Sequence, residues 1–238
     1  MIIEKRIAVI TGAGKGIGLA ISNGLANLGY QTVMISRHAG DLKYAAEEII
    51  RAGGLAPLSI QMDITDTEKL VAAVKEIKQK YGRIDVLVNN AGIYVDGTLE
   101  LSESDFKSMI DTNLVAHFNL TKEVVRLMKK QKSGYIFNIV SRSGKIGFSG
   151  TGGYSASKFG MLGLNESLYR ELVPKGIRVT ALCPGWVNTQ MAFKAGTPLQ
   201  EMEMIQPDDL FETVKWLLSL SAGACVKEVV LEAPFSQA

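Results

Sequence analysis

The sequence has little of what several classes of protein depend on. Its two cysteines, Cys183 and Cys225, are too few for a disulfide framework and lack metal-ligand spacing, so each is interpreted as a small buried apolar residue. Its two histidines, His38 and His117, are interpreted as structural or solvated side chains. The sequence therefore indicates neither an oxidising compartment nor a metal site.

Balanced charge and short hydrophobic runs exclude further classes. The chain has 26 Lys and Arg against 24 Asp and Glu, a net charge of +2, and it has no long basic run. Nucleic acid and anionic membranes are therefore not expected as partners, whereas a small molecule is. No apolar stretch approaches membrane-spanning length, and Met1–Thr11 lacks the apolar core of a signal peptide. A cytoplasmic location is the resulting expectation.

Short β-rich runs that alternate with helical segments predict the fold class. The runs are Ile7–Ile10, Thr32–Ile35, Ala56–Gln61, Val86–Val88, Tyr135–Val140, Arg178–Leu182 and Val226–Leu231. Runs without polar alternation suit parallel strands that are covered on both faces. No linker or repeat divides the 238 residues, so residues 1–238 are expected to form a single domain. We predict an α/β fold with one doubly wound parallel sheet of about seven strands and helices on both faces.

Two helical segments are apolar on more than one face. One is Met109–Met128, and the other begins at Phe159 and continues through Leu164. A helix that is apolar on more than one face is buried on more than one face. We therefore expect a second copy of the chain to cover both segments, in a homodimer or homotetramer. A thick core within one subunit is the alternative.

A glycine-rich turn follows the first predicted strand and opens the first predicted helix. The segment Thr11–Gly18 reads T-G-A-G-K-G-I-G, with Lys15 and Ile17 among its glycines. Gly12, Gly16 and Gly18 allow a tight turn, close approach of the backbone to a pyrophosphate and close packing of helix on strand. The strand, turn and helix context is the one that this motif requires, so we predict a Rossmann-type dinucleotide-binding domain.

Tyr154 and Lys158 are four residues apart in a predicted helix and therefore project from the same face. A tyrosine loses its proton only near pH ~10, and a nearby ammonium favours the phenolate. A general acid or base is most efficient when its pKa approaches the operating pH. The pair is therefore typical of a site that protonates or deprotonates an oxygen, although this spacing alone also fits a solvated helix face.

The G-x-x-x-G-x-G turn and the Y-x-x-x-K pair together resemble the short-chain dehydrogenase/reductase family, over essentially the whole chain. Three further segments match that family: N-N-A-G at 89–92, the Asp that follows the third strand, and P-G-x-V-x-T at 184–189. In isolation each of these is an ordinary turn or loop. The resemblance implies cofactor contacts at Gly12, Lys15, Gly16, Ile17, Gly18, Ser36, Arg37, Asp63, Ile64, Asn90, Ala91, Gly92, Tyr154, Lys158, Pro184, Gly185, Val187 and Thr189.

The residues after the second strand bear on the choice of cofactor. A site that prefers NAD places a carboxylate there, on the ribose 2′-hydroxyl, but this sequence has Ser36 and Arg37. Arg37 can bind a phosphate bidentately and Lys15 can add a point charge. We therefore favour NADP(H) over NAD(H). The alternative is that Arg37 is a surface charge and either cofactor binds.

The resemblance also implies a catalytic tetrad of Asn113, Ser141, Tyr154 and Lys158. In it Tyr154 protonates the substrate oxygen, Ser141 hydrogen-bonds that oxygen, Lys158 binds the nicotinamide ribose and stabilises the Tyr154 phenolate, and Asn113 holds a water linked to the lysine. Ser143 is the competing serine, but the spacing to Tyr154 favours Ser141. The expected activity is hydride transfer between a nicotinamide and a carbonyl or secondary alcohol.

The substrate is less well defined by the sequence. The Met-rich segment 190–206 fits a lid over an apolar or acyl substrate, although packing against the body explains it equally well. The expected substrate contacts are Tyr94, Ile146, Phe148, Met191 and Phe193.

The nearest familiar pattern is the 3-oxoacyl-carrier-protein reductase branch of the family. That branch would use an acyl carrier protein as partner, and Lys132 and Lys175 occupy corresponding basic positions, although Lys132 also fits a solvated helix end. The ending V-L-E-A-P-F at 230–235 departs from the V-D-G-G type of that branch. A broad-specificity reductase of ketones, sugars or pteridine-like compounds is the alternative. A non-catalytic NADP-sensing protein is a more distant one, because the tetrad is complete.

Overall fold

The computed structural model describes residues 5–234, which contain one seven-stranded parallel sheet. The strands are β1 (Ile7–Thr11), β2 (Gln31–Ser36), β3 (Leu58–Gln61), β4 (Val86–Asn89), β5 (Gly134–Ile139), β6 (Ile177–Pro184) and β7 (Glu228–Leu231). Their order in the sheet is β3-β2-β1-β4-β5-β6-β7. The order reverses direction between β1 and β4, where ligands bind in doubly wound folds. The predicted fold class is confirmed.

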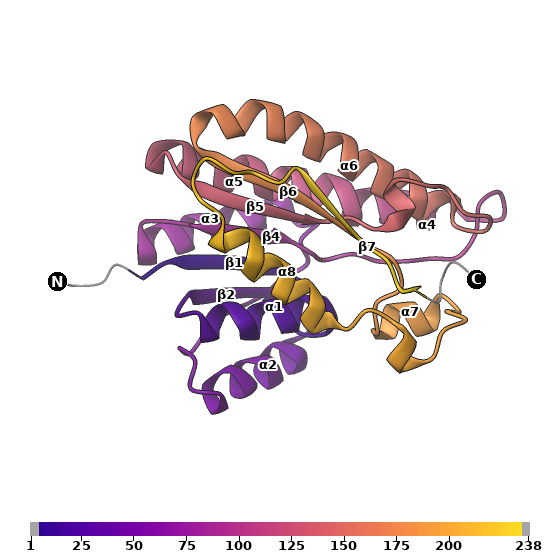
Figure 1. The fold of residues 1–238 in the computed structure, drawn as a ribbon, viewed down its shortest axis with the longest axis horizontal. Coiled ribbons are helices and arrows are strands. Elements are labelled where there is room, and N and C mark those ends of the chain that lie inside the picture. Colours follow the sequence, from indigo (N-terminus) through magenta and orange to yellow (C-terminus); the bar gives the residue numbers. More distant parts are fainter. Residues whose placement is uncertain (1–4, 235–238) are drawn as a thin grey trace.

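Helices cover both faces of the sheet (Figure 1). They are α1 (Gly16–Asn27), α2 (Ala39–Arg51), α3 (Thr67–Tyr81), α4 (Glu103–Ile110), α5 (Ala116–Gln131), α6 (Gly152–Leu172), α7 (Gln190–Lys194) and α8 (Pro207–Ser219). The layer of α1, α2 and α8 packs on one face, and α3, α5 and α6 pack on the other. Successive residues of β1 alternate between the two cores: Ala8 and Ile10 face α1, whereas Ile7 and Val9 face α3 and α5. This double burial explains why the strand is apolar throughout.

Helix ends follow the capping residues in the sequence. Asp66 begins α3 by accepting the Lys69 N–H at 3.1 Å, and Ser102 begins α4 by accepting the Asp105 N–H at 3.0 Å. Gly82 ends α3 in the left-handed conformation, with φ +72°. These local signals fix where each helix turns back toward the sheet.

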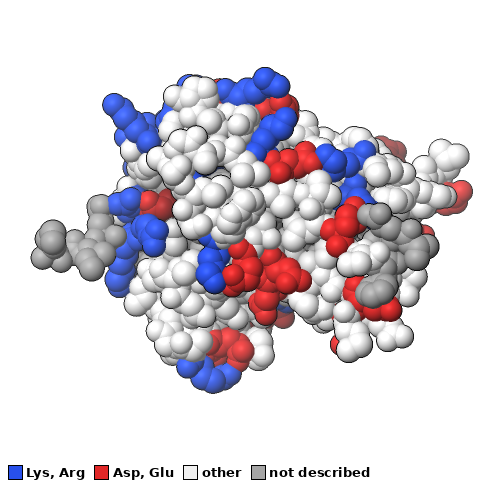
Figure 2. All heavy atoms as spheres, viewed as in Figure 1, with Lys and Arg blue, Asp and Glu red and all other residues white. Residues whose placement is uncertain are grey.

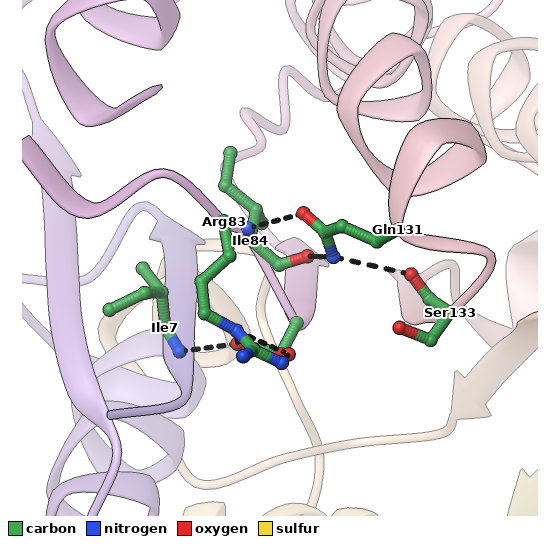
Figure 3. Close-up of polar contacts among 6 residues, drawn as sticks. Ile7, Arg83, Ile84, Gln131 and Ser133 are labelled. Atoms are coloured by element: carbon green, nitrogen blue, oxygen red, sulfur yellow. Dashed lines mark hydrogen bonds and ion pairs between the residues drawn. The ribbon is translucent and has the colours of Figure 1, made fainter. Parts of the chain in front are cut away.

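A polar network closes the edge of the sheet at which the strands begin (Figure 3). Asp85, just before β4, accepts the Ile7 N–H at 2.8 Å and binds Arg83 through Oδ1 at 2.7 Å. Gln131, at the end of α5, accepts the Ile84 N–H at 3.0 Å and donates to the Ile84 carbonyl at 2.8 Å. Backbone groups beyond the ends of the strands are thereby satisfied by side chains. The network ties β1, β4 and α5 together at the end opposite to the strand carboxyl ends.

Charged side chains of both signs are interspersed over the face that Figure 2 shows, and the densest acidic patch lies over α8. This helix carries Asp208, Asp209 and Glu212. No broad basic surface is present on this face, which agrees with the balanced charge of the sequence. None of the helices within residues 5–234 combines the length and hydropathy that a membrane crossing needs.

The apolar segments for which a second subunit is expected are half-covered in this single chain. Phe118 on α5 and Phe159 on α6 are both 46% exposed, and Val115 is 40% exposed. Leu114 and Leu162 pack between these helices and the sheet. The two exposed phenylalanines agree with the prediction of a homo-oligomer, which stays a prediction.

Candidate active site

A cleft of about 1010 Å³ opens at the carboxyl ends of the strands. Loops that follow β1, β2, β4, β5 and β6 form its walls, and Figure 1 shows α7 beyond the end of β7. It brings together most of the residues predicted for the site. Those that line it are Gly12, Lys15, Gly16, Ile17, Ser36, Arg37, Asp63, Ile64, Asn90, Ala91, Gly92, Tyr94, Ser141, Phe148, Tyr154, Lys158, Pro184, Gly185, Val187, Thr189, Met191 and Phe193.

The glycine-rich turn is built for close backbone approach. Gly12 and Gly16 have φ angles of +63° and +52°, which L side chains rarely adopt. A Cβ on Gly18 would lie 2.2 Å from the Gly12 carbonyl oxygen, so this third glycine, just outside the cleft lining, allows the turn to close. α1 begins at Lys15 without a side-chain cap and has no acidic residue in its first turn. Its first N–H groups therefore point at a site suited to a pyrophosphate.

Thr11 joins this turn to the N-N-A-G segment, a role that sequence reasoning did not assign. Its hydroxyl accepts the backbone N–H groups of Asn90 and Ala91 at 2.9 and 3.0 Å and donates to the Val88 carbonyl at 3.3 Å. The Asn90 side-chain amide donates in turn to the Thr11 carbonyl at 2.9 Å. The only sequence signal for this role is the position of Thr11, directly before Gly12 at the end of β1. These bonds hold the loops after β1 and β4 in register.

The basic residues predicted to read the cofactor phosphate lie at one end of the cleft. Arg37 Nη1 is 3.7 Å from Asp63 Oδ2, and both side chains are about half exposed. Asp63 Oδ1 accepts the Thr65 N–H at 2.9 Å and its hydroxyl at 2.7 Å. Burial raises the pKa of Asp63, but the Thr65 hydrogen bonds and the Arg37 charge outweigh it, so the pKa lies below its usual value. Lys15 Nζ donates to Gln190 Oε1 at 3.2 Å and so connects the glycine-rich turn to α7.

The loop after β6 crosses above the glycine-rich turn. The Gly185 N–H donates to the Leu231 carbonyl at 2.8 Å, which ties the loop to β7. A Cβ on Gly16 would lie 3.1 Å from Thr189 Cγ2, so Thr189 directly covers the turn. The Thr189 hydroxyl accepts the Ala192 N–H at 3.4 Å and thereby begins α7. Thr189 thus lies beside the glycine-rich turn and also has a local capping role, and its contact with the cofactor stays a prediction.

Lys158 and Tyr154 extend from α6 toward the carboxyl end of β5. The Lys158 side chain is only 4% exposed, and its ammonium donates to the Ile139 carbonyl at 3.0 Å. It lies 5.6 Å from the centre of the Tyr154 ring. Ser141 follows β5 and hydrogen-bonds Tyr154, while the Ser141 hydroxyl accepts the Ser143 N–H at 3.1 Å. The structure therefore brings Ser141, rather than Ser143, against the tyrosine.

The acidities of this pair differ from the expectation. Burial raises the pKa of Tyr154 to about 12, and only the hydrogen bond with Ser141 acts in the lowering direction. Burial also lowers the pKa of Lys158 to about 8. The expected lowering of the Tyr154 pKa by Lys158 is therefore not found, because desolvation of the phenol dominates and the ammonium is directed at the Ile139 carbonyl. At neutral pH Tyr154 is a phenol and Lys158 an ammonium.

Asn113 is completely buried beside this pair. It lies in a π-helical turn, Asp111–Val115, between α4 and α5, and such turns are frequent at functional sites. Its amide donates to the Ile93 carbonyl at 2.9 Å and to the Ser157 hydroxyl at 3.0 Å, and its Oδ1 accepts the Ile93 N–H at 2.8 Å. Both N–H donors of the amide are thus engaged, so a water could use only the remaining lone pair of Oδ1 or backbone groups.

Gly92 lies where Asn113 and Lys158 converge. A Cβ on Gly92 would be 3.3 Å from Asn113 Oδ1 and 3.8 Å from Lys158 Nζ. The structure therefore brings together the N-N-A-G loop, the π-helical turn and α6 at one point. Ser157, which sequence reasoning did not assign, fixes this arrangement by donating to the Tyr154 carbonyl at 2.7 Å while it accepts from Asn113.

His117 is buried behind the N-N-A-G segment. Its Nε2 lies 2.6 Å from the Ala91 carbonyl, and burial lowers its pKa to about 4, so the neutral imidazole donates this bond. Its predicted structural role therefore includes support of a loop that lines the cleft. No group of three or more His, Cys, Asp or Glu side chains in the part of the chain that the structure describes is arranged to hold a metal ion.

The other end of the cleft is aromatic and apolar. Tyr94, Phe148, Met191 and Phe193 line it, and their contact with a substrate stays a prediction. Ile146, also predicted to contact substrate, does not line the cleft and is 57% exposed. Its N–H closes a helical turn onto the Arg142 carbonyl at 3.1 Å, which leaves the side chain in solvent.

The predicted lid segment has two kinds of contact. Its first part, α7, lines the cleft, whereas Met204 and Ile205 are buried in the body and Ile205 bridges to Val187. Met202, between these parts, is 85% exposed. The segment is therefore anchored at its far end and meets the cleft at its near end.

This fold and cleft define a dinucleotide-dependent oxidoreductase of the α/β class. A family model described as short chain dehydrogenase matches residues 6–199, and the chain belongs to this family. The chain is therefore an oxidoreductase that acts on CH–OH and C=O groups.

Three relatives cover nearly the whole chain. A beta-ketoacyl-ACP reductase (FabG) from Bacteroides thetaiotaomicron has a crystal structure that is 47% identical, with a TM-score of 0.88, over 98% of this chain and 99% of that chain. A 3-oxoacyl-(acyl-carrier-protein) reductase from Synechocystis sp. is 37% identical over 230 residues, which are 93% of this chain and 92% of the relative. A metagenomic short-chain oxidoreductase in complex with NADP is 31% identical, with a TM-score of 0.84, over 95% of this chain and 96% of that chain.

Proposed function

We propose that this protein is an NADP(H)-dependent reductase of 3-oxoacyl thioesters. The observation that carries the proposal is the convergence of Ser141, Tyr154, Lys158 and Asn113 at the inner end of the cleft that the glycine-rich turn opens. Names of relatives that are 37–47% identical over more than nine-tenths of the chain support the substrate class. The NADP complex of a third relative supports the cofactor.

The residues of the chain suit the proton side of this reaction. When bound, NADPH supplies a hydride to the carbonyl carbon of the substrate. Tyr154, whose pKa is raised to about 12, is a phenol at neutral pH and donates its proton to the carbonyl oxygen as charge develops there. Ser141 hydrogen-bonds Tyr154 and can donate to the same oxygen. Because an alkoxide is far more basic than a phenolate, proton transfer from Tyr154 to the developing alkoxide is downhill even at this raised pKa.

Lys158 and Asn113 hold Tyr154, the proton donor, in place. The buried Lys158 ammonium faces the tyrosine ring and reaches the N-N-A-G loop at Gly92, where it can bind the ribose of the nicotinamide. Asn113 orients this loop through Ile93 and orients α6 through Ser157. The segment 190–206 serves as a cover that closes over the substrate from its anchor at Ile205.

The preference for NADP(H) is tested by Arg37→Asp. We expect kcat/KM for NADPH to fall about a hundredfold and that for NADH to change little, because the new carboxylate repels a 2′-phosphate and also faces Asp63, which lies 3.7 Å from Arg37. Steady-state kinetics with both cofactors measure the ratio. Arg51→Asp, at the exposed end of α2 and outside the cleft, makes the same charge change and is the control. Equal losses for both cofactors would show that Arg37 does not read the phosphate.

The positions of Lys132 and Lys175 bear on whether an acyl carrier protein delivers the substrate. Lys132 precedes β5 and Lys175 precedes β6, so both lie at the edge where the strands begin. Ser141 follows β5 and Pro184 ends β6, at the opposite edge, and a strand of six residues is about 20 Å long. The lysines are therefore remote from the cleft of their own subunit. An acyl carrier protein bound there faces the edge opposite to the cleft of the same subunit, so we propose carrier recognition by these lysines only for the assembled oligomer.

A substrate panel separates the proposal from its alternative. NADPH oxidation is followed with acetoacetyl thioesters of coenzyme A and of an acyl carrier protein, and with a simple diketone. The proposal expects kcat/KM for the thioesters to exceed that for the diketone at least tenfold. The open, apolar outer end of the cleft favours the alternative of a broad ketone reductase, which the reverse order would support. No turnover of any carbonyl would contradict both and support an NADP-sensing role.

A further inference from the structure

A second tyrosine lies against the catalytic one without a role in the proton transfer. Tyr94, in the loop between β4 and α4, packs edge-on to Tyr154, with ring centroids 5.3 Å apart and an interplanar angle of 75°. This geometry is a favourable one for two aromatic rings. The Tyr94 hydroxyl donates to Asp96 Oδ1 at 2.9 Å. Both Tyr94 and Asp96 line the cleft.

The two residues that follow Asp96 hold its loop in place. The Gly97 N–H donates to the Gly150 carbonyl at 2.6 Å, and the Gly152 N–H donates to Thr98 Oγ1 at 3.1 Å. A Cβ on Gly150 would lie 3.6 Å from Asp96 Oδ1. The loop that carries Asp96 is thus joined to the loop that leads into α6, the helix of Tyr154. Asp96 therefore keeps a fixed relation to the reacting end of the cleft.

The positively charged side chains of Lys158 and Arg142, which also line this cleft, already have hydrogen-bond or ion-pair partners. The Lys158 ammonium is buried and donates to the Ile139 carbonyl. Arg142 binds Glu232 at 3.1 Å and stacks on the Phe148 ring at 4.8 Å. Asp96, by contrast, is exposed within the cleft and places a negative charge at the hydroxyl of Tyr94, whose ring packs against Tyr154.

From this arrangement we propose that Tyr94 and Asp96 together select the charge of the substrate. They admit an uncharged 3-oxoacyl derivative and reject the free 3-oxo acid. A free 3-oxo acid carries its carboxylate two carbons from the reacting carbonyl. With the carbonyl at Tyr154 and the acid end lying along Tyr94, that carboxylate faces the Asp96 charge. A thioester or ester has no charge at this position. The inference rests on the proposed function, since it specifies which 3-oxo compounds the same site accepts.

The test compares acetoacetate with its neutral ester, ethyl acetoacetate, as substrates of the full chain with NADPH. In the wild type we expect a kcat/KM ratio strongly in favour of the ester. Asp96→Asn keeps an acceptor for the Tyr94 hydroxyl but removes the charge, and it is expected to raise the acetoacetate-to-ester ratio roughly tenfold. Glu100→Gln, an exposed acid outside the cleft lining in the same loop, is the matched control and should leave the ratio unchanged.

The dependence of kcat/KM on ionic strength distinguishes an electrostatic role of Asp96 from a merely structural one. Salt screens the repulsion between Asp96 and a substrate carboxylate, so kcat/KM of the wild type for acetoacetate should rise when KCl is increased from about 0.05 to about 0.5 M. Asp96→Asn should lose this salt dependence. Tyr94→Phe keeps the ring against Tyr154 but releases Asp96, and it should reduce the selectivity by less than Asp96→Asn does.

Failure of this inference can be distinguished from failure of the proposed function. If the wild type reduces 3-oxo esters and Asp96→Asn has the wild-type ratio and salt dependence, the selection by charge is wrong and the proposed function stands. If the wild type reduces no 3-oxo ester, the proposed substrate class is wrong. The same ratio is then measured with acetoacetate and pentane-2,4-dione, a neutral diketone of similar size, and an unchanged ratio in Asp96→Asn again overturns the inference.

Discussion

Tyr154→Phe is expected to lower kcat for carbonyl reduction by about a thousandfold while the affinity for NADPH stays within a factor of about three. The substitution removes the one hydroxyl that both hydrogen-bonds Ser141 and faces the open cleft from α6. It retains the ring, and with it the edge-on contact to Tyr94 and the position of the Lys158 ammonium 5.6 Å from the ring centre. The loss should therefore fall on the chemical step. Stopped-flow kinetics and cofactor fluorescence titration measure the two quantities separately.

Two further measurements make this result specific. Tyr44→Phe, on the exposed face of α2, removes a phenol outside the cleft lining and should have wild-type kcat. The melting temperature of Tyr154→Phe should stay close to that of the wild type, because the ring packing is retained. A variant that keeps more than about a tenth of the wild-type kcat would show that another group is the proton donor.

Most of the fold could be predicted because its signals are local. Short β-rich runs marked every strand, and all seven strands pair in a parallel sheet. The central strand β6, Ile177–Pro184, is three residues longer than the predicted run Arg178–Leu182. β3 and β7 are each two residues shorter, because they begin later than the predicted runs at Ala56 and Val226. These are the two edge strands. An edge strand pairs on one side only, so its apolar run does not determine how far the pairing extends.

The composition of the site could be predicted because residues at strand ends must meet. Ser141 follows β5 and Pro184 ends the neighbouring strand β6, and parallel strands place their carboxyl ends at one edge. The contacts of Thr11, Ser157 and His117 could not be predicted, since each joins elements through tertiary packing that no local pattern encodes. The same limit explains Ile146, which a helical turn directs into solvent.

The pKa values of Tyr154 and Lys158 were predicted least well from the spacing of these residues in the sequence. A Tyr and a Lys four residues apart suggested that the charge of the lysine controls the phenol. Burial instead raises the pKa of Tyr154 to about 12 and lowers that of Lys158 to about 8. Desolvation acts on both groups against their charged forms. The degree of burial depends on how α6 packs on β5 and β6, which the sequence of the helix does not contain.

Lys158 is therefore expected to dominate the pH dependence of reduction. Burial raises the pKa values of Tyr154, Tyr94 and Cys183 to about 12 and lowers that of His117 to about 4, so these groups do not titrate between pH ~6 and ~10. Lys158, with a pKa of about 8, is an ammonium below this value and an amine above it. Because the ammonium is the form that binds ribose hydroxyls and supports proton transfer, kcat/KM for NADPH should fall as the pH rises through about 8, approaching a tenfold loss per pH unit.

Substitution of Lys158 tests this assignment and distinguishes catalysis from folding. Lys158→Met should lower kcat/KM by about a thousandfold. The folded-state pKa of Lys158 lies below that of the unfolded chain, so between about pH 8 and 10 the unfolded state binds more protons and stability rises with pH. At neutral pH the buried ammonium is thus a cost, and the methionine variant should be more stable by on the order of 2 kcal/mol. Calorimetry at pH 7 measures this difference, and Lys122→Met, on α5 and outside the cleft lining, is the control. A wild-type profile that stays flat from pH 7 to 10, or an inactive Lys158→Met with a lowered melting temperature, would contradict the role of a desolvated ammonium in this site.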